Sequence, residues 1–185
     1  MPQQFRRIVT GHNQDGRSII ESDGRPGAVG RLGRTNLHEM WITDRVPADN
    51  AVPGDAADRP ISLEPPENGS VFRFFQLDPE SSLPSIGERH KEWERRIAAM
   101  DEEARKRISR LRPDTSRHPG MHRTKTVDYI ILLKGDVTML LDEDEVDLKP
   151  FDVVVQRGTN HAWVNKGSEP ALLAAVQIDA LSDVG

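Results

Sequence analysis

The sequence has no cysteine among its 185 residues. This absence excludes disulfide bonds, thiolate metal sites and cysteine nucleophiles, and it is typical of proteins that work in a reducing cytosol. Long apolar runs are missing too: no window is apolar enough to cross a membrane, and the first residues lack the hydrophobic stretch of a secretory signal. We therefore expect a cytoplasmic protein without a membrane partner.

An excess of positive charge is also missing. Acidic residues outnumber basic ones by 30 to 25, the net charge is -5, and no tail is rich in Lys or Arg. Proteins that bind nucleic acids generally neutralise phosphates with a basic surface, so we expect no nucleic-acid partner. The low hydrophobic content of 36% places part of the chain in solvated loops or exposed helix, although 185 residues suffice for one core.

Residues 1–84 alternate short strand patterns with loops. The strand-like stretches are FRRIVTGH, SIIES, NLHEMWIT and VFRFFQL. Between them, residues 23–34 are rich in Gly and Arg and match no phosphate-binding fingerprint, so we interpret them as a loop. The proline-rich residues 46–69 cannot form a long regular element, and a loop of this length is expected to wrap the domain as a partial lid.

Residues 85–112 have the period of a helix. Ser85 and Glu88 form a capping-box pattern at the start, and Pro113 ends the segment. Apolar residues recur at steps of three and four, which predicts one long amphipathic helix on the outside of the domain. This face comprises Trp93, Ile97, Met100, Ala104, Ile108 and Leu111.

Residues 114–180 return to the period of a sheet. Six short strand patterns with turn-forming residues between them predict an antiparallel sandwich or barrel, and with the preceding parts they predict a single domain over residues 1–185. The stretch DYIILL is apolar on both faces, so the strand needs cover on both sides. A second copy of the chain is one way to supply it, and we expect a homodimer.

Three polar residues share one face of the first strand of this region. His122, Thr124 and Asp128 have even numbers, so an extended strand points them the same way. His161 follows a turn that contains Gly158. If the two strands are neighbours, two imidazoles and one carboxylate converge, which is the ligand set of many Fe(II) sites and also suits Mn, Ni or Zn.

These residues resemble the two motifs of the cupin superfamily, and the resemblance covers the last third of the chain. The first motif corresponds here to His122, Thr124, Asp128 and Gly135, with the family spacing. The second corresponds to Gln156, Gly158, His161 and Asn165. The resemblance implies an all-β fold, the cupin-type antiparallel β-barrel or double-stranded β-helix, here with N-terminal strands that complete the barrel and one long outer helix.

The resemblance also implies a metal site, from which the chain departs. His122 and His161 match family ligands, Asp128 replaces a Glu, and Thr124 replaces a His whose role a neutral hydroxyl fills poorly. The residues thus allow one divalent metal (Fe, Mn, Ni or Zn) held by two His and an Asp. They equally allow a metal-free pocket in which a histidine is the acid or base and Asp128 orients it.

Three functions stay open for this pocket. The first is a metal-dependent enzyme on a small organic substrate, of the oxygenase, decarboxylase, isomerase or dehydratase type. The second is metal-free acid–base catalysis, and the third is a binding module without catalysis. In each case we expect Thr124, Trp163 and Arg157 to contact the bound molecule, Lys125 being an alternative cation, while Tyr129 points away.

Overall fold

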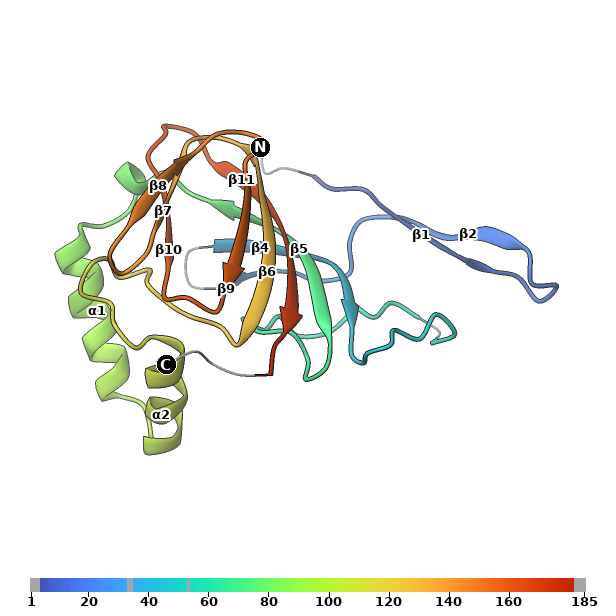
Figure 1. Cartoon of the computed structure of the whole chain (residues 1–185), viewed down its shortest axis with the longest axis horizontal. Helices are drawn as coiled ribbons and strands as arrows, with labels where there is room; N and C mark the ends of the chain where they lie inside the picture. Colours follow the sequence, from blue (N-terminus) through green and yellow to red (C-terminus); the bar gives the residue numbers. More distant parts are fainter. Residues whose placement is uncertain (1–3, 33–34, 53, 182–185) are drawn as a thin grey trace.

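The structure, a computed structural model, describes residues 4–32, 35–52 and 54–181. Within them a hairpin of two strands projects from a barrel of two antiparallel sheets, with the helices on one side (Figure 1). The hairpin consists of β1 (Arg7–His12) and β2 (Ser18–Gly24). The larger sheet has the order β3 (Val29–Leu32), β4 (Thr35–Thr43), β5 (Ser70–Leu77), β11 (Ala171–Asp179), β6 (Thr126–Lys134), β9 (Val153–Arg157). The smaller has the order β10 (Ala162–Asn165), β7 (Val137–Leu140), β8 (Glu145–Leu148). The helices are η1 (Glu80–Ser82), α1 (Ile86–Ala98) and α2 (Glu102–Leu111).

Strand β6 shows how the alternating pattern builds the barrel. Thr126, Asp128, Ile130 and Leu132 are buried, whereas Tyr129 between them is exposed. Both sheets contribute apolar side chains to one core, so the all-β barrel predicted from the sequence is confirmed. The buried members of this core are Leu37, Phe75, Ile130, Leu132, Val137, Leu148, Ala171, Leu173 and Ala175.

The Gly- and Arg-rich residues 23–34 contain a strand, which corrects the interpretation of this segment as a loop. Strand β3 pairs antiparallel with β4, where Val29 lies opposite His38. Gly30 lies close to the proline-rich loop, since a Cβ atom there would come within 2.7 Å of the end of the Ile61 side chain. A strand of four residues that includes a glycine has too short a pattern to be recognised from sequence.

The helical segment 85–112 is divided into two helices, which corrects the expectation of one long helix. Asp101 accepts a hydrogen bond from the Ala104 amide at 2.8 Å and so starts α2 as an N-cap. The capping box of Ser85 and Glu88 at the start of α1 is confirmed. The apolar face is also confirmed, since it is buried or half-buried in both helices. No helix in the described part of the chain is long and apolar enough to span a bilayer.

Arg73 attaches the proline-rich loop to the large sheet. Its side chain is buried and forms an ion pair with buried Glu39 of β4, with Nη2 3.0 Å from a carboxylate oxygen. The same nitrogen donates to the carbonyl oxygen of Ser62 at 2.9 Å. Farther along the loop, Glu64 pairs with Arg110 of α2. The loop thus closes over the sheet and leaves a cavity of about 160 Å³ beside Glu39 and Arg73.

The Glu39–Arg73 pair gives a test of this arrangement. Arg73→Met would leave the Glu39 carboxylate buried without a counter-charge, and we expect the free energy of unfolding to fall by about 3–5 kcal/mol. Glu39→Met combined with Arg73→Met should recover most of this loss, because no buried charge then remains. Urea unfolding followed by circular dichroism measures both. The control is Lys106→Met, which breaks an exposed ion pair with Glu102 and should change the free energy of unfolding little. If Arg73→Met destabilises the protein no more than Lys106→Met does, the prediction is contradicted.

Candidate functional site

His122 and His161 lie side by side at the seam between the two sheets. The His122 amide donates to the His161 carbonyl at 2.9 Å, and the His161 amide donates back at 2.8 Å. This antiparallel bridge joins the segment that leads into β6 of the large sheet to the start of β10 in the small sheet. The two imidazole rings therefore face each other, with centroids 4.4 Å apart. The sequence-based expectation that they converge is met in the structure.

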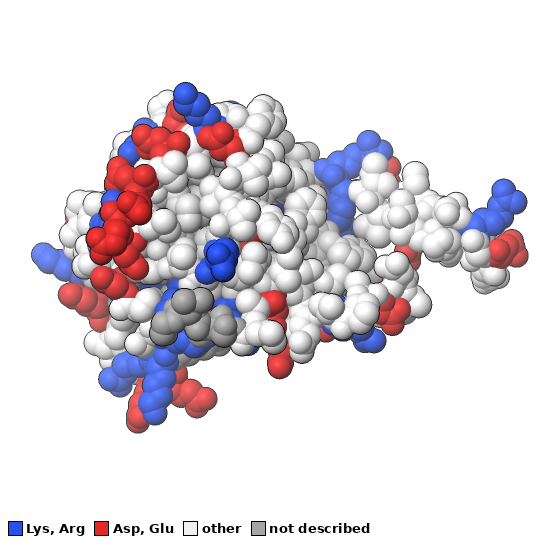
Figure 2. Space-filling view, in the orientation of Figure 1, with Lys and Arg blue, Asp and Glu red and all other residues white. Residues whose placement is uncertain are grey.

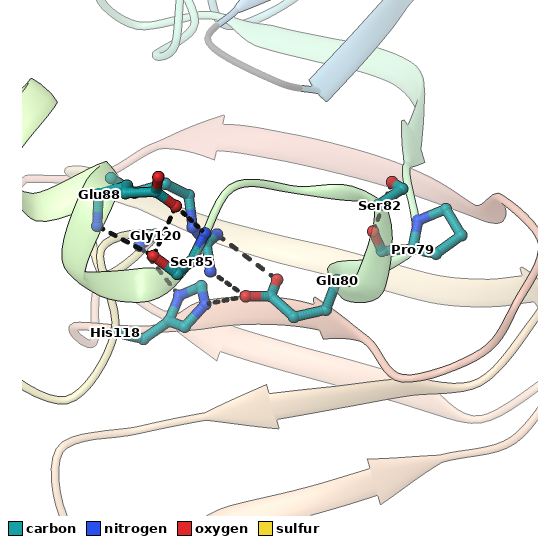
Figure 3. A network of polar contacts seen from close by, with 8 residues as sticks. Pro79, Glu80, Ser82, Ser85, Glu88, His118 and Gly120 are labelled. Carbon is teal, nitrogen blue, oxygen red and sulfur yellow. Dashed lines mark hydrogen bonds and ion pairs between the residues drawn. The ribbon is translucent and has the colours of Figure 1, made fainter.

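A polar network fixes the turn that precedes His122 (Figure 3). The Gly120 amide donates to Nδ1 of His118 at 3.0 Å, so the ring proton of His118 lies on Nε2 and points to Glu80 of η1, 3.4 Å away. Glu80 also pairs with Arg89 of α1. Both nitrogens of His118 are thus engaged, and burial lowers its pKa although Glu80 opposes this. His118 anchors the turn to the helices.

One nitrogen of each facing imidazole is held by the backbone. Nδ1 of His122 lies 2.9 Å from the Gly120 carbonyl oxygen, and Nδ1 of His161 lies 2.9 Å from that of Thr159. The amide nitrogen of Gln156 approaches Nδ1 of His161 at 2.7 Å. Neither Nε2 atom forms a hydrogen bond with any described residue. Nε2 is therefore the atom of each ring that can contact a bound molecule.

Both imidazoles are neutral at physiological pH. Burial, followed by the neighbouring His122, lowers the pKa of His161 to about 3. Burial is also the main cause that lowers the pKa of His122, and the positive charge of Arg112 adds to it. A neutral imidazole presents an acceptor or an N–H donor at Nε2, depending on its tautomer, but no charge.

Asp128 lies deeper in the barrel than its place in the motif suggested. In the sheet it stands between Gln177 of β11 and Gln156 of β9, and Gln177 donates weakly to it at 3.4 Å. Its other oxygen is buried without a partner. Burial raises the pKa of Asp128, although Thr126 and Gln177 oppose this. Gln156 lies opposite Asp128 in the register of the sheet, and its side chain reaches His161.

The three proposed metal ligands do not form one cluster. Residues 4–32, 35–52 and 54–181 contain no group of three or more His, Asp or Glu side chains placed to hold an ion. The two Nε2 atoms have the environment of metal ligands, since Nδ1 of each ring meets a carbonyl group. Because no carboxylate joins them, this arrangement does not fit a three-ligand site.

The three residues expected to contact a substrate lie in different surroundings. Trp163 packs edge-on against His161, with ring centroids 5.5 Å apart, and against the core. Thr124 is buried and bonds to Thr126 at 2.7 Å. Arg157 is exposed on the outer face of β9, since its buried neighbour Gln156 takes the inner face. This placement corrects the expectation that Arg157 reaches the interior.

Two inner residues were not found by sequence reasoning. Gln156 entered the sequence analysis only as a residue of the second motif, although a polar residue at the end of the apolar run VVVQ is a signal for a buried amide. Gln177 similarly interrupts the last strand and is buried beside Asp128. Their roles depend on which residues of β6, β9 and β11 lie opposite one another, and this register cannot be read from the sequence.

Comparisons with known proteins agree with this geometry. The model of the family described as "Cupin domain" matches residues 107–177. Phomopsin biosynthesis cluster protein D of Diaporthe leptostromiformis is 51% identical over 169 residues, which cover 86% of this chain and 70% of that protein. The cupin-domain-containing oxidoreductase fogC of Aspergillus ruber is 35% identical over 185 residues, covering 94% and 71%.

Among solved structures, the polyketide cyclase RemF of Streptomyces resistomycificus is 13% identical to this chain, with a TM-score of 0.42 over 96% of this chain and 80% of that one. The family is shown by the sequence relatives and by the family model. Both agree with the barrel and with the bridge between His122 and His161. The chain belongs to the cupin superfamily.

Proposed function

We propose that the chain is an enzyme that moves a proton on a small organic molecule bound in the barrel beside His122 and His161. The observation that carries this proposal is the pair of facing imidazoles, each held through Nδ1 by a backbone carbonyl and with Nε2 left without a protein partner. Rings fixed in this way need no reorganisation when a molecule binds, which favours a catalytic role.

An acid and a base with opposite pKa changes support the proton transfer. Burial favours the neutral form of His122, which accepts a proton at Nε2 in the tautomer whose proton lies on Nδ1. Burial raises the pKa of Asp128 and so shifts this carboxyl toward its protonated form. Groups whose pKa values are shifted by burial are concentrated at functional sites, which supports an acid–base role. Isomerisation and dehydration need only such transfers, so we favour these two reaction types.

Oxidation is the second candidate, and the printed name of the relative fogC favours it. It requires a redox-active group, and the predicted ligands His122, His161 and Asp128 do not form one cluster that could hold it in the described arrangement. The names of two relatives as phomopsin biosynthesis cluster proteins support a small organic substrate under either candidate.

Hydrogen–deuterium exchange tests the proposal without a known product. We expect the protein in D₂O to exchange C–H protons next to the carbonyl group in at least one member of a panel of ketones, oxo acids and hydroxy ketones, followed by NMR. His122→Ala should slow this exchange by about 10²–10⁴-fold, the usual contribution of a general base. His12→Ala changes an exposed histidine of the hairpin and should have no effect.

Elemental analysis of the same samples separates the candidates. Hydrogen–deuterium exchange by metal-free protein supports acid–base catalysis. Activity that requires stoichiometric Fe, Mn, Ni or Zn supports the metal-dependent oxidation. Exchange that His122→Ala leaves unchanged would contradict the role of His122. Binding without turnover by any panel member would favour a binding module.

The low pKa of His161 predicts a pH-dependent stability. The ordinary value is 6.5 and the value in the folded protein is about 3, so between these pH values the unfolded chain binds more protons than the folded one. The free energy of unfolding should therefore fall as the pH falls through this range, by up to about 1.4 kcal/mol per pH unit for this group.

Urea unfolding at several pH values between 4 and 7 measures this slope. His161→Gln should make the dependence shallower, and His12→Gln should leave it unchanged. An unaltered slope in His161→Gln would show that the imidazole is not held in its neutral form.

We further propose that two copies associate through the outer face of β6 and β9. Tyr129 lies opposite Val155 and Ile131 opposite Val153, and all four are exposed. Strand β9 ends the sheet, so its outer edge is open. Charged side chains are sparse on this face and acidic ones gather over the small sheet (Figure 2). A second copy would cover the apolar face.

Light scattering after size exclusion should give the mass of a dimer. Val153→Lys combined with Val155→Lys should weaken association by at least about tenfold, since burial of one valine contributes ~1.5–3 kcal/mol. Val146→Lys changes an exposed valine of β8 in the other sheet and is the matched control. A monomeric wild type, or a double variant that stays dimeric, would contradict this interface.

A further inference from the structure

We propose that Arg112 binds a carboxylate group of the molecule held beside His122, so that the substrate is a small organic acid. This inference rests on the proposed function, because it assumes a small ligand at the imidazole pair. It adds a residue that the motifs do not contain and narrows the chemical class of the substrate.

Arg112 and His122 are held by the same turn. Arg112 caps the C-terminus of α2, where its amide donates to the Ile108 carbonyl at 2.8 Å. Its Nη2 donates to the Pro119 carbonyl, and the next carbonyl, that of Gly120, meets Nδ1 of His122. The guanidinium and the imidazole therefore depend on consecutive carbonyl groups of one turn. Because Pro119 and Gly120 are adjacent, this turn holds the two side chains near each other.

The charge of Arg112 has no acidic partner in the part of the chain that the structure describes. The guanidinium carbon lies 4.1 Å from the ring centroid of Trp93, which compensates the charge only in part. Nε is buried and has no hydrogen-bond acceptor. Neighbouring arginines differ: Arg89 pairs with Glu80 and Arg110 with Glu64.

A half-buried cation without a counter-charge is costly, and proteins rarely retain one that does nothing. Burial lowers the pKa of Arg112, and no acid opposes this effect. A ligand anion would supply the missing charge. The charge and the unused N–H therefore indicate a site that is completed by binding.

The geometry of the donors favours a carboxylate. Arginine presents parallel N–H groups in a plane, which match the two oxygens of a carboxylate. The Trp93 ring covers one face of the guanidinium, so a ligand oxygen would meet the N–H groups in the plane of the guanidinium. His122 and His161 are neutral and contribute no positive charge, so Arg112 supplies the charge that retains an acid at the imidazoles.

Two pairs of matched probes test this site: benzoate with benzamide, and acetate with acetamide. Each amide has the shape of its acid without the charge. We expect the carboxylates to raise the melting temperature of the full chain saturably and to give a measurable Kd by calorimetry, whereas the amides do neither. Arg112→Gln should weaken carboxylate binding by about 10–100-fold, as expected for a charge-assisted hydrogen bond.

Two further variants control this experiment. Arg96→Gln removes an exposed arginine of α1 and should leave carboxylate binding unchanged. Arg112→Lys keeps the charge but loses the planar donors, and its affinity should lie between wild type and Arg112→Gln. If Arg112→Gln does not fold, Arg112→Lys decides the test, and wild-type affinity in Arg112→Lys would overturn the proposal.

The remaining outcomes separate this inference from the proposed function. No carboxylate binding at the highest soluble concentration, equal binding of acids and amides, or equal affinity in Arg112→Gln would each overturn the carboxylate site. Exchange of neutral ketones that requires His122 but not Arg112 would overturn this inference and retain the enzyme. Carboxylate binding that requires Arg112, with no exchange of any acid in the panel, would retain this inference and contradict the enzyme.

Discussion

Two main-chain hydrogen bonds between His122 and His161 connect the two sheets of the barrel. They join the approach to β6 with the start of β10, and so they set both the closure of the barrel and the distance between the imidazoles. Side-chain substitution leaves these bonds in place, because they belong to the backbone. The site can therefore change its chemistry while the barrel keeps its shape, which is consistent with a family whose members differ in their ligand residues.

Near this bridge, polar side chains form a row across the inside of the large sheet. Gln177, Asp128 and Gln156 stand in register on three neighbouring strands, and Gln156 reaches His161. Arg73 adds a buried charge from β5, where it is paired with Glu39. Buried polar groups with incomplete hydrogen bonding are uncommon in finished cores. Their concentration here is typical of a surface that receives a ligand.

Much of the fold follows from local patterns, and what does not follow depends on distant residues. Alternation placed Asp128 and Ile130 inside and Tyr129 outside, and helical periodicity identified the covered face of the helical segment. The break at Asp101 was not predicted, although Asp followed by two Glu is a start signal. The convergence of His122 and His161 was expected because spacing and motif agreed.

Other features of the site needed the tertiary structure. Gln177 became visible only when its register with Asp128 was known. Arg157 was expected to contact the bound molecule on the strength of its charge, and only the alternation along β9 shows that it lies on the exposed face. Arg112 is an ordinary helix-terminal arginine in the sequence, and its lack of an acidic partner is a property of packing alone.

The position of β11 has a consequence for how the protein is made. This last strand lies between β5 and β6 in the middle of the large sheet. During synthesis β5 is completed long before its neighbour β11, so this edge of β5 stays unpaired until that strand is made. Contacts so distant in sequence form slowly, and unpaired strand edges attract other chains in the meantime. We therefore expect the β5 edge to need protection until β11 is made.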